Sequence, residues 1–218
     1  MLHVLYEDNH IIVVNKKPGE ITQGDKTGDE PLSEKVKRFI KNRDQKPGNV
    51  FLGTVHRLDR PVSGAIIFAK TSKALQRLNK MFQNKEIQKT YWAKCINAPT
   101  TEHQKLVHFL VKDSSKNITS AYTKAVTGGK KSELIYTHLK NNKIQNLIEV
   151  KPLTGRHHQI RVQLSSIGCV IVGDMKYGAS SANKDKSICL HAKNIEFIHP
   201  VSKEKITIHA PIPHKNWK

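Results

Sequence analysis

The amino-acid sequence predicts an α+β domain built on a mixed, mostly antiparallel sheet flanked by helices and loops. Short apolar and β-branched runs recur along the chain and are separated mainly by brief polar turns, which favours antiparallel strands over βαβ units. Only a few segments show the periodicity of an amphipathic helix. No linker clearly divides the 218 residues, so we expect a single domain over residues 1–218.

The N-terminal part predicts two short strands, a loop and a helix. Residues 4–6 and 10–15 (HIIVVN) are expected to be strands around an Asp-Asn turn. The segment 16–32 is rich in Gly, Asp and Thr and is expected to be a loop. A short helix follows, and its apolar face consists of Leu32, Val36, Phe39 and Ile40.

The middle of the chain predicts a buried strand and the clearest helix. Residues 65–69 (AIIFA) are apolar throughout, as expected for a buried strand. The helix that follows has Ser72 as its expected N-cap. Its apolar stripe has helical spacing and consists of Ala74, Leu75, Leu78, Met81 and Phe82.

The rest of the chain predicts further strands and one more helix. The helix is expected over residues 156–167, with Ile160, Leu164 and Ile167 facing the core. The strands are expected at residues 90–96, 105–111, 133–139, 144–150, 188–198 and 205–209.

Net charge is the strongest signal in the composition. The chain has 37 Lys and Arg against 18 Asp and Glu, which gives a formal charge of +19 at pH 7. Such an excess attracts polyanions, and nucleic acid is the most common polyanion in a cytoplasm. A generic lysine-rich surface is the alternative. Aromatic residues make up only 6% of the chain, which argues against a wide stacking platform for single strands.

Membrane and secretion signals are absent from the sequence. No apolar run approaches the roughly 20 residues of a membrane span, and the N-terminus lacks the layout of a signal peptide. We therefore expect a soluble, cytoplasmic protein without membrane contact. Cys95, Cys169 and Cys189 are expected to be reduced and mostly buried.

Motifs for common cofactors and metals are also absent from the sequence. There is no G-x-G-x-x-G loop and no H-E-x-x-H pair. On a helix, the adjacent His157 and His158 would point about 100° apart and could not both face one ion. We expect neither a functional metal nor a cofactor.

The segment HRLDRPVSGAIIFAK, residues 56–70, places one carboxylate, Asp59, between Arg57 and Arg60. In one interpretation, the aspartate forms a salt bridge that fixes a loop. In the other, the neighbouring positive charge keeps the carboxylate ionised in a pocket, where it can act as a nucleophile or base on a sugar carbon. A glycoside hydrolase would usually need a second carboxylate as proton donor, whereas the strongest motifs here supply arginines.

A second arginine-rich segment, KPLTGRHHQIRVQL, covers residues 151–164. In the predicted helix Arg156 and Arg161 are five residues apart and project about 140° from each other, so they should not share a target. The N-terminus of such a helix favours anions. A solvated basic helix is the alternative interpretation.

Together these motifs resemble those of the RluA-type RNA pseudouridine synthases. H-R-L-D followed by R-P-V-S-G, at residues 56–64, is similar to the main motif of that family. The likeness runs over about residues 2–213. The other similar segments occur in the family's order and are YEDNHIIVVNK (6–16), QKTY (88–91), TGRHHQIR (154–161), GDMKYG (173–178) and LHA (190–192).

The resemblance implies the pseudouridine synthase catalytic domain and an RNA-uridine isomerase that uses no cofactor. Asp59 matches the family's essential aspartate, Tyr91 the tyrosine that stacks against the uracil ring, and Arg161 the arginine that pairs with the aspartate. Arg57 matches the arginine that takes the place of the flipped base, which offsets part of a flipping cost of a few kcal/mol. The resemblance leaves open whether the aspartate attacks C1′ or acts as a base at C2′.

The basic surface of the domain is expected to bind the RNA. Besides Arg57, the candidate contacts are Arg60, Lys70, Arg156 and His157, with further lysines in residues 70–73 and 112–131. No S4-like N-terminal module is expected, and the protein is expected to be a monomer.

The substrate is expected to be ribosomal or transfer RNA. R-P-V-S-G, His157 and Gln163 depart from the family's more frequent residues, which obscures the subfamily. Two alternatives remain: a catalytically silent RNA-binding or ribosome-assembly factor on the same fold, and a glycosidase that liberates free uracil.

Overall fold

The computed structural model describes residues 2–24, 28–140, 143–213 and 216–217. The chain divides into two compact units, Met1–Gln88 with Ala192–Ile212 and Lys89–His191 with Pro213–Lys218. Each unit combines strands with helices, so the predicted α+β class is confirmed. A single domain over residues 1–218 stays a prediction.

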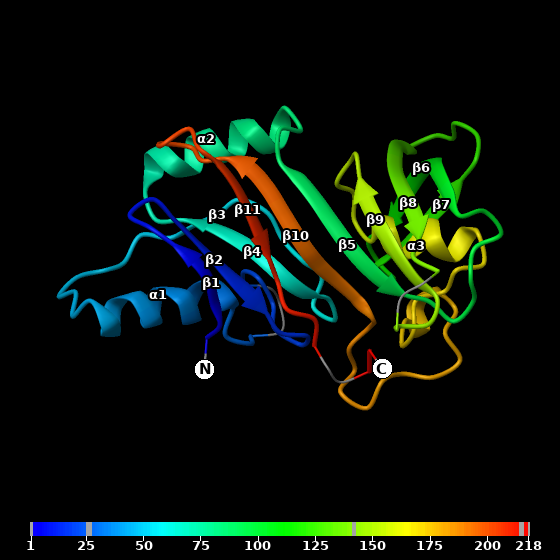
Figure 1. The fold of residues 1–218 in the computed structure, drawn as a ribbon, viewed down its shortest axis with the longest axis horizontal. Coiled ribbons are helices and arrows are strands. Elements are labelled where there is room, and N and C mark those ends of the chain that lie inside the picture. Colours follow the sequence, from blue (N-terminus) through cyan, green and yellow to red (C-terminus); the bar gives the residue numbers. More distant parts are fainter. Residues whose placement is uncertain (1, 25–27, 141–142, 214–215, 218) are drawn as a thin grey trace. The chain divides into compact units, whose positions relative to one another are not determined.

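The first unit contains a sheet in which β1, β2, β4 and β10 are neighbours in that order, with β3 paired to β4 and β11 to β10 (Figure 1). The pairs β1–β2, β2–β4, β3–β4 and β10–β11 are antiparallel. The bounds of these strands are β1 (Val4–Glu7), β2 (Ile11–Lys16), β3 (Gly53–Thr54), β4 (Ser63–Ala69), β10 (Leu190–Ile198) and β11 (Lys205–His209).

The centre of this sheet is buried on both faces. All seven residues of β4 are buried, as predicted for AIIFA, and Val14 of β2 lies opposite Ile66. One face of β4, with Ala65 and Ile67, belongs to a core cluster that also contains Leu78 of the helix α2 (Ser72–Gln83). A strand with two buried faces reads as a continuous apolar run, because neither set of alternate residues faces water.

Two helices belong to the first unit, α1 (Leu32–Arg43) and α2 (Ser72–Gln83). Both confirm the predicted helices, but the N-cap of α2 is Thr71 and not Ser72. Thr71 has an extended backbone, and its hydroxyl oxygen accepts the N–H of Ala74 at 3.2 Å, whereas Ser72 is already the first helical residue. The capping hydroxyl must sit just outside the helix to reach an unpaired N–H.

Gly64 of β4 occupies a position that only glycine fits well. Its φ is +119°, and a Cβ there would lie 2.4 Å from the carbonyl oxygen of Ala192 and 2.5 Å from its nitrogen. Both the left-handed backbone and the close approach of β10 therefore exclude a side chain. This accounts for the glycine in R-P-V-S-G.

The second unit contains an antiparallel sheet with strand order β5-β9-β8-β6-β7. Four of its strands confirm predictions. β7, with the sequence ITSAY, was not predicted, because its alternation is weak and its pairing with β6 defines it. The bounds are β5 (Gln88–Lys94), β6 (His103–Asp113), β7 (Ile118–Tyr122), β8 (Lys130–His138) and β9 (Leu147–Pro152).

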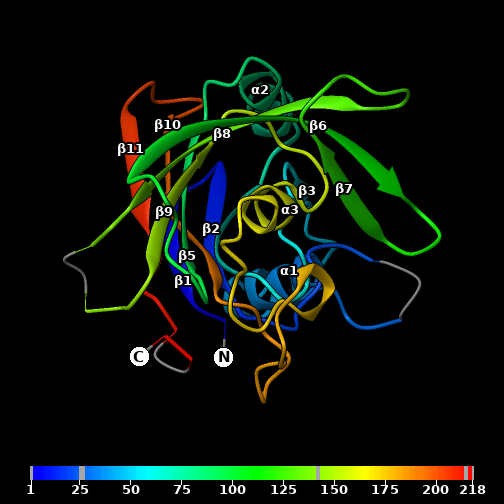
Figure 2. The same cartoon turned by 90° about the vertical axis from the view of Figure 1, so that its right-hand side faces the viewer.

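The helix of the second unit, α3 (Gln159–Ser166), packs against β6 and β7 (Figure 2). It begins at residue 159 and not at the predicted 156, because His158 has φ 51° in the left-handed region. Arg156 therefore precedes the helix, and the 140° relationship expected between Arg156 and Arg161 is wrong. A short 3-10 helix, η1 (Met175–Tyr177), follows α3. Among the described residues, no helix combines the length and apolar character needed to cross a bilayer.

Candidate active site

Asp59 lies in a tightly held turn immediately before β4. The N–H of Val62 donates to the carbonyl oxygen of Asp59 at 3.0 Å, which closes the turn around Arg60 and Pro61. The hydroxyl of Thr22 accepts the N–H of Leu58 and donates to its carbonyl oxygen, both at 3.3 Å. The backbone on both sides of Asp59 is thus fixed, while its side chain is half-buried.

The two arginines that flank Asp59 have different surroundings. The Nε of Arg60 donates to the carbonyl oxygen of Gly19 at 3.0 Å, and its Nη2 forms an ion pair with Asp29. Arg57 is exposed, and no hydrogen bond or ion pair holds its guanidinium to the described part of the chain. Arg60 therefore helps to fix the loop before α1, whereas Arg57 is available for an external anion.

Arg161 is buried in the second unit and has a charged partner that was not predicted. Its Nε and Nη2 each donate to a carboxylate oxygen of Asp174 at 2.7 Å, and its guanidinium carbon lies 5.0 Å from the ring centroid of Tyr177. Such a bidentate pair fixes the plane of the guanidinium.

Tyr91 lies on β5 opposite Val150 and is also buried. Asp59 belongs to the first unit, so the pairing of Arg161 with Asp59 stays a prediction.

Tyr177, whose ring lies beside the guanidinium of Arg161, belongs to a network of polar contacts. The Tyr177 hydroxyl accepts the N–H of Thr119 at 2.9 Å and lies 2.8 Å from Nδ1 of His158. Burial, together with the charge of Arg161, lowers the pKa of His158 to about 2. His158 is therefore neutral at physiological pH.

The rings of His157 and His158 stack with centroids 3.7 Å apart, so the predicted divergence of 100° is wrong: neither residue lies within the helix. Nδ1 of His157 is 2.8 Å from the hydroxyl of Thr119, and Nε2 is 3.0 Å from the amide oxygen of Asn117. Both ring nitrogens thus already have protein partners. A contact between His157 and RNA stays a prediction.

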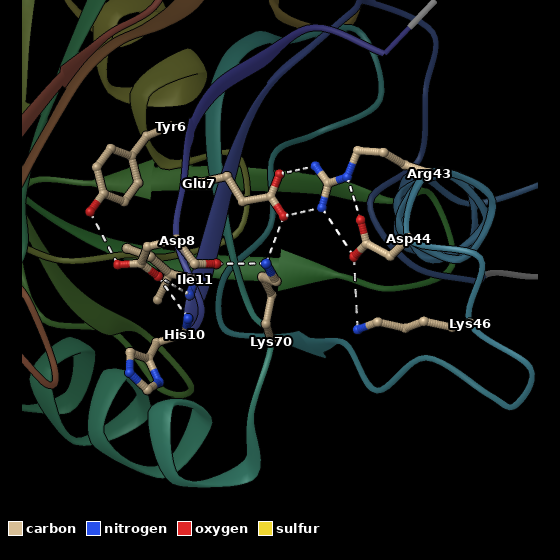
Figure 3. Close-up of polar contacts among 9 residues, drawn as sticks. All are labelled: Tyr6, Glu7, Asp8, His10, Ile11, Arg43, Asp44, Lys46 and Lys70. Atoms are coloured by element: carbon tan, nitrogen blue, oxygen red, sulfur yellow. Dashed lines mark hydrogen bonds and ion pairs between the residues drawn. The ribbon is translucent and has the colours of Figure 1, made fainter.

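Lys70 belongs to a network of charges at the end of β1 (Figure 3). Its ammonium donates to Glu7 and to the carbonyl oxygen of Asp8, both at 2.6 Å, and Glu7 also accepts from Arg43 of α1. Hydrogen bonds from Arg43 and then Lys70 lower the pKa of Glu7. This geometry favours a structural role for Lys70, and its predicted contact with RNA is untested. Arg156, in contrast, is exposed.

No metal-binding group is found within the described ranges: no three His, Cys, Asp or Glu side chains are arranged to hold an ion. All three cysteines are free thiols, and all are buried as predicted. Burial raises the pKa of each thiol.

Three residues beside the predicted site, Lys16, Thr22 and Asp174, were not identified from the sequence. Lys16 and Thr22 contact the Asp59 turn, and Asp174 binds Arg161. Lys16 ends an apolar strand and Asp174 follows a glycine in GDMKYG, but neither pattern indicates which residue the charged group contacts. The signal for Lys16 in the sequence is that a charged residue follows almost directly after a run of apolar residues that are expected to be buried.

Comparison with known proteins identifies the family of this chain. A family model described as RNA pseudouridylate synthase matches residues 10–166. The chain belongs to the RNA pseudouridylate synthase family. Among its relatives, ribosomal large subunit pseudouridine synthase C of Buchnera aphidicola subsp. Baizongia pistaciae is 34% identical over 97% of this chain and 67% of that protein. The protein of the same name from Vibrio cholerae is 32% identical over 96% of this chain and 65% of its own length.

The fold of this synthase family member agrees with solved structures. Human RNA Pseudouridylate Synthase Domain Containing 4 superposes with a TM-score of 0.79 at 20% identity, covering 97% of this chain and 89% of that chain. Human RNA Pseudouridylate Synthase Domain Containing 1 gives 0.75 at 22% identity, covering 98% and 84%. The chain spans about two thirds of the length of the first curated relatives.

Proposed function

We propose that this protein converts uridine in RNA to pseudouridine, with Asp59 as the essential carboxylate. The observation that carries the proposal is the family membership of a chain whose H-R-L-D segment forms a fixed turn with the Asp59 side chain half-buried. Relatives are named as ribosomal large subunit and tRNA pseudouridine synthases, so ribosomal or transfer RNA is the proposed substrate. The net charge of +19 supports a polyanionic partner.

The proposed reaction needs no oxidant, reductant or metal. The bond between C1′ and N1 breaks, a bond between C1′ and C5 forms, the C5 proton leaves, and N1 is protonated. Asp59 would act at C1′ or C2′, Tyr91 would stack against the detached uracil, and Arg161 would favour the ionised carboxylate. Arg57, which is exposed and untethered within the described ranges, would enter the RNA helix in place of the flipped base.

The remaining predicted contacts fall into two groups. Arg156 is exposed and suited to bind phosphate. Arg60, Lys70 and His157 already have protein partners, so a contribution to RNA binding would come on top of a structural role.

Release of tritium from cellular RNA labelled with 5-³H-uridine tests the proposal. Purified protein without added cofactor is expected to release tritium, and Asp59→Asn is expected to abolish release while keeping RNA affinity, because the amide can neither attack nor accept a proton. Asp44→Asn, an exposed carboxylate at the end of α1, is the matched control and should react normally. Normal turnover by Asp59→Asn would refute the assignment of Asp59.

The products and the cellular phenotype separate the two alternatives. Chromatography of the digested RNA should show pseudouridine, whereas a glycosidase would release free uracil. A catalytically silent assembly factor would complement a deletion strain equally well with wild type and with Asp59→Asn. Carbodiimide-dependent primer-extension stops, compared between a deletion strain and its parent, would locate the modified uridine.

A further inference from the structure

Lys16 is a fully buried lysine that points at the turn of Asp59. It is the last residue of β2 and has 0% exposure. Its ammonium lies 2.6 Å from the carbonyl oxygen of Val62, 3.1 Å from that of Lys17, and 3.2 Å from those of Asp59 and Arg60. Burying an ammonium costs several kcal/mol unless hydrogen bonds compensate, so this arrangement requires its four acceptors.

Three of these four carbonyl groups belong to the turn that carries Asp59. Apart from Lys16, the turn is closed by the N–H of Val62 and by the N–H of Gly19, which donates to the carbonyl oxygen of Arg60 at 2.8 Å. The oxygen atoms of Asp59, Arg60 and Val62 converge on one positive charge, although carbonyl dipoles aligned in this way repel one another. The conformation of the turn therefore depends on the charge at its centre.

We propose that Lys16 is a positioning residue whose ammonium holds the Asp59 turn in its reactive geometry. The proposal rests on the proposed function, because it assigns Lys16 to the reaction of Asp59. An ammonium offers three N–H donors to the four oxygen atoms, whereas a neutral amine offers two donors and a lone pair that faces a carbonyl oxygen. Loss of the proton should loosen the turn and displace the carboxylate.

Lys16 is expected to lose its proton within a pH range in which the activity can be measured. Burial lowers the pKa of Lys16 to about 7, while Glu20 and Asp59 raise it and Arg60 lowers it further. The charged groups that face Lys16 thus come from the loop after β2 and from the turn itself. As the pH rises above about 7, we expect the rate constant of the chemical step to fall.

The stability of the protein should change in the opposite direction. In the unfolded chain a lysine keeps its ordinary pKa of 10.5, so between about pH 7 and 10.5 the unfolded state binds more protons than the folded state. The free energy of unfolding contributed by Lys16 therefore rises with pH in this window. A fall in rate combined with a gain in stability separates positioning from a general loss of structure.

Single-turnover tritium release with enzyme in excess over RNA tests the proposal. Between about pH 6 and about pH 8.5, the wild-type rate constant should fall as a single group with a pKa of about 7 loses its proton, while RNA affinity at fixed salt stays constant. Lys16→Met should react at least about tenfold more slowly than wild type near pH 6 and show a flat profile, so that the two rates converge toward about pH 8.5; its RNA affinity should be unchanged, because a misplaced reactive group costs rate and not binding. Lys17→Met removes the neighbouring exposed lysine and should behave like wild type.

Lys16→Arg provides the second variant, because its guanidinium keeps its charge throughout this pH range. It should retain part of the activity and show a flat pH profile. A wild-type profile that is flat from about pH 6 to about pH 8.5, or a Lys16→Met enzyme with the wild-type rate at about pH 6, would overturn the proposal. If Lys16→Met does not fold, the pH profiles of wild type and Lys16→Arg still test the proposal. Activity of Asp59→Asn would instead refute the proposed function itself.

Discussion

Arg161 and Asp174 form a bidentate ion pair in the interior of the second unit. Two hydrogen bonds of 2.7 Å join them, and their side chains are 6% and 1% exposed. The pair joins α3 to the segment before η1, and it holds the guanidinium that the family resemblance assigns to catalysis. The segment GDMKYG therefore fixes the position of Arg161, a residue of the proposed site.

We expect Asp174→Ala to be strongly destabilising, because it leaves the guanidinium of Arg161 buried without this carboxylate. Removing one partner of a buried pair typically lowers the free energy of unfolding by about 3–5 kcal/mol. Urea unfolding followed by circular dichroism measures this loss. As a control, Glu102→Ala breaks the exposed pair with Lys140 and should change little. Equal losses in the free energy of unfolding would show that the buried pair contributes no more to stability than the exposed pair.

Gly64→Ala should lower stability more than a comparable substitution elsewhere. An alanine at φ +119° costs about 1–3 kcal/mol in backbone strain. Its Cβ would also meet the backbone of Ala192, so β4 and β10 must separate locally. Gly128→Ala is the matched control, since Gly128 has φ +73° and a Cβ there would meet no atom within 4 Å, so this variant reports the strain alone. Thermal unfolding of both variants should place Gly64→Ala well below Gly128→Ala.

The neutral His158 predicts a loss of stability in weak acid. Its pKa is about 2 in the folded protein against 6.5 for an ordinary histidine, so between these values the unfolded state binds more protons. The free energy of unfolding should therefore fall as the pH drops below about 6.5. His158→Asn, which tolerates the left-handed backbone, should weaken this dependence.

Urea unfolding at about pH 7 and about pH 5 measures the effect of His158. His103→Asn, at an exposed position of β6, should keep the wild-type difference between the two pH values. An unchanged difference in His158→Asn would contradict the assignment of this pH dependence to His158.

Much of the fold could be predicted because its elements carry strong periodic patterns. β4 and α2 are examples: one is apolar throughout and the other has a complete helical stripe. β7 carries no such pattern, and only its pairing with β6 makes it a strand. The start of α3 depends on the left-handed conformation of His158, which a non-glycine residue adopts rarely and which local sequence does not specify.

The sequence proposes residues for the candidate site, but the contacts that hold these residues are evident only in the structure. Family resemblance pointed to Asp59 and Arg161, but the buried ammonium of Lys16 and the carboxylate of Asp174 contact them from distant segments. Such pairs are defined by three-dimensional proximity, since nothing in the spacing of 13 residues between Arg161 and Asp174 requires a contact. Sequence patterns report burial and periodicity, whereas partner choice depends on tertiary packing.

The burial of all three native thiols makes site-specific labelling practical in this protein. The thiolate is the form that reacts with maleimides, and burial raises the pKa of Cys95, Cys169 and Cys189 alike. A cysteine introduced in place of the exposed Lys73 on α2 would therefore react first. A fluorophore attached there could follow RNA association in real time without removal of any native cysteine.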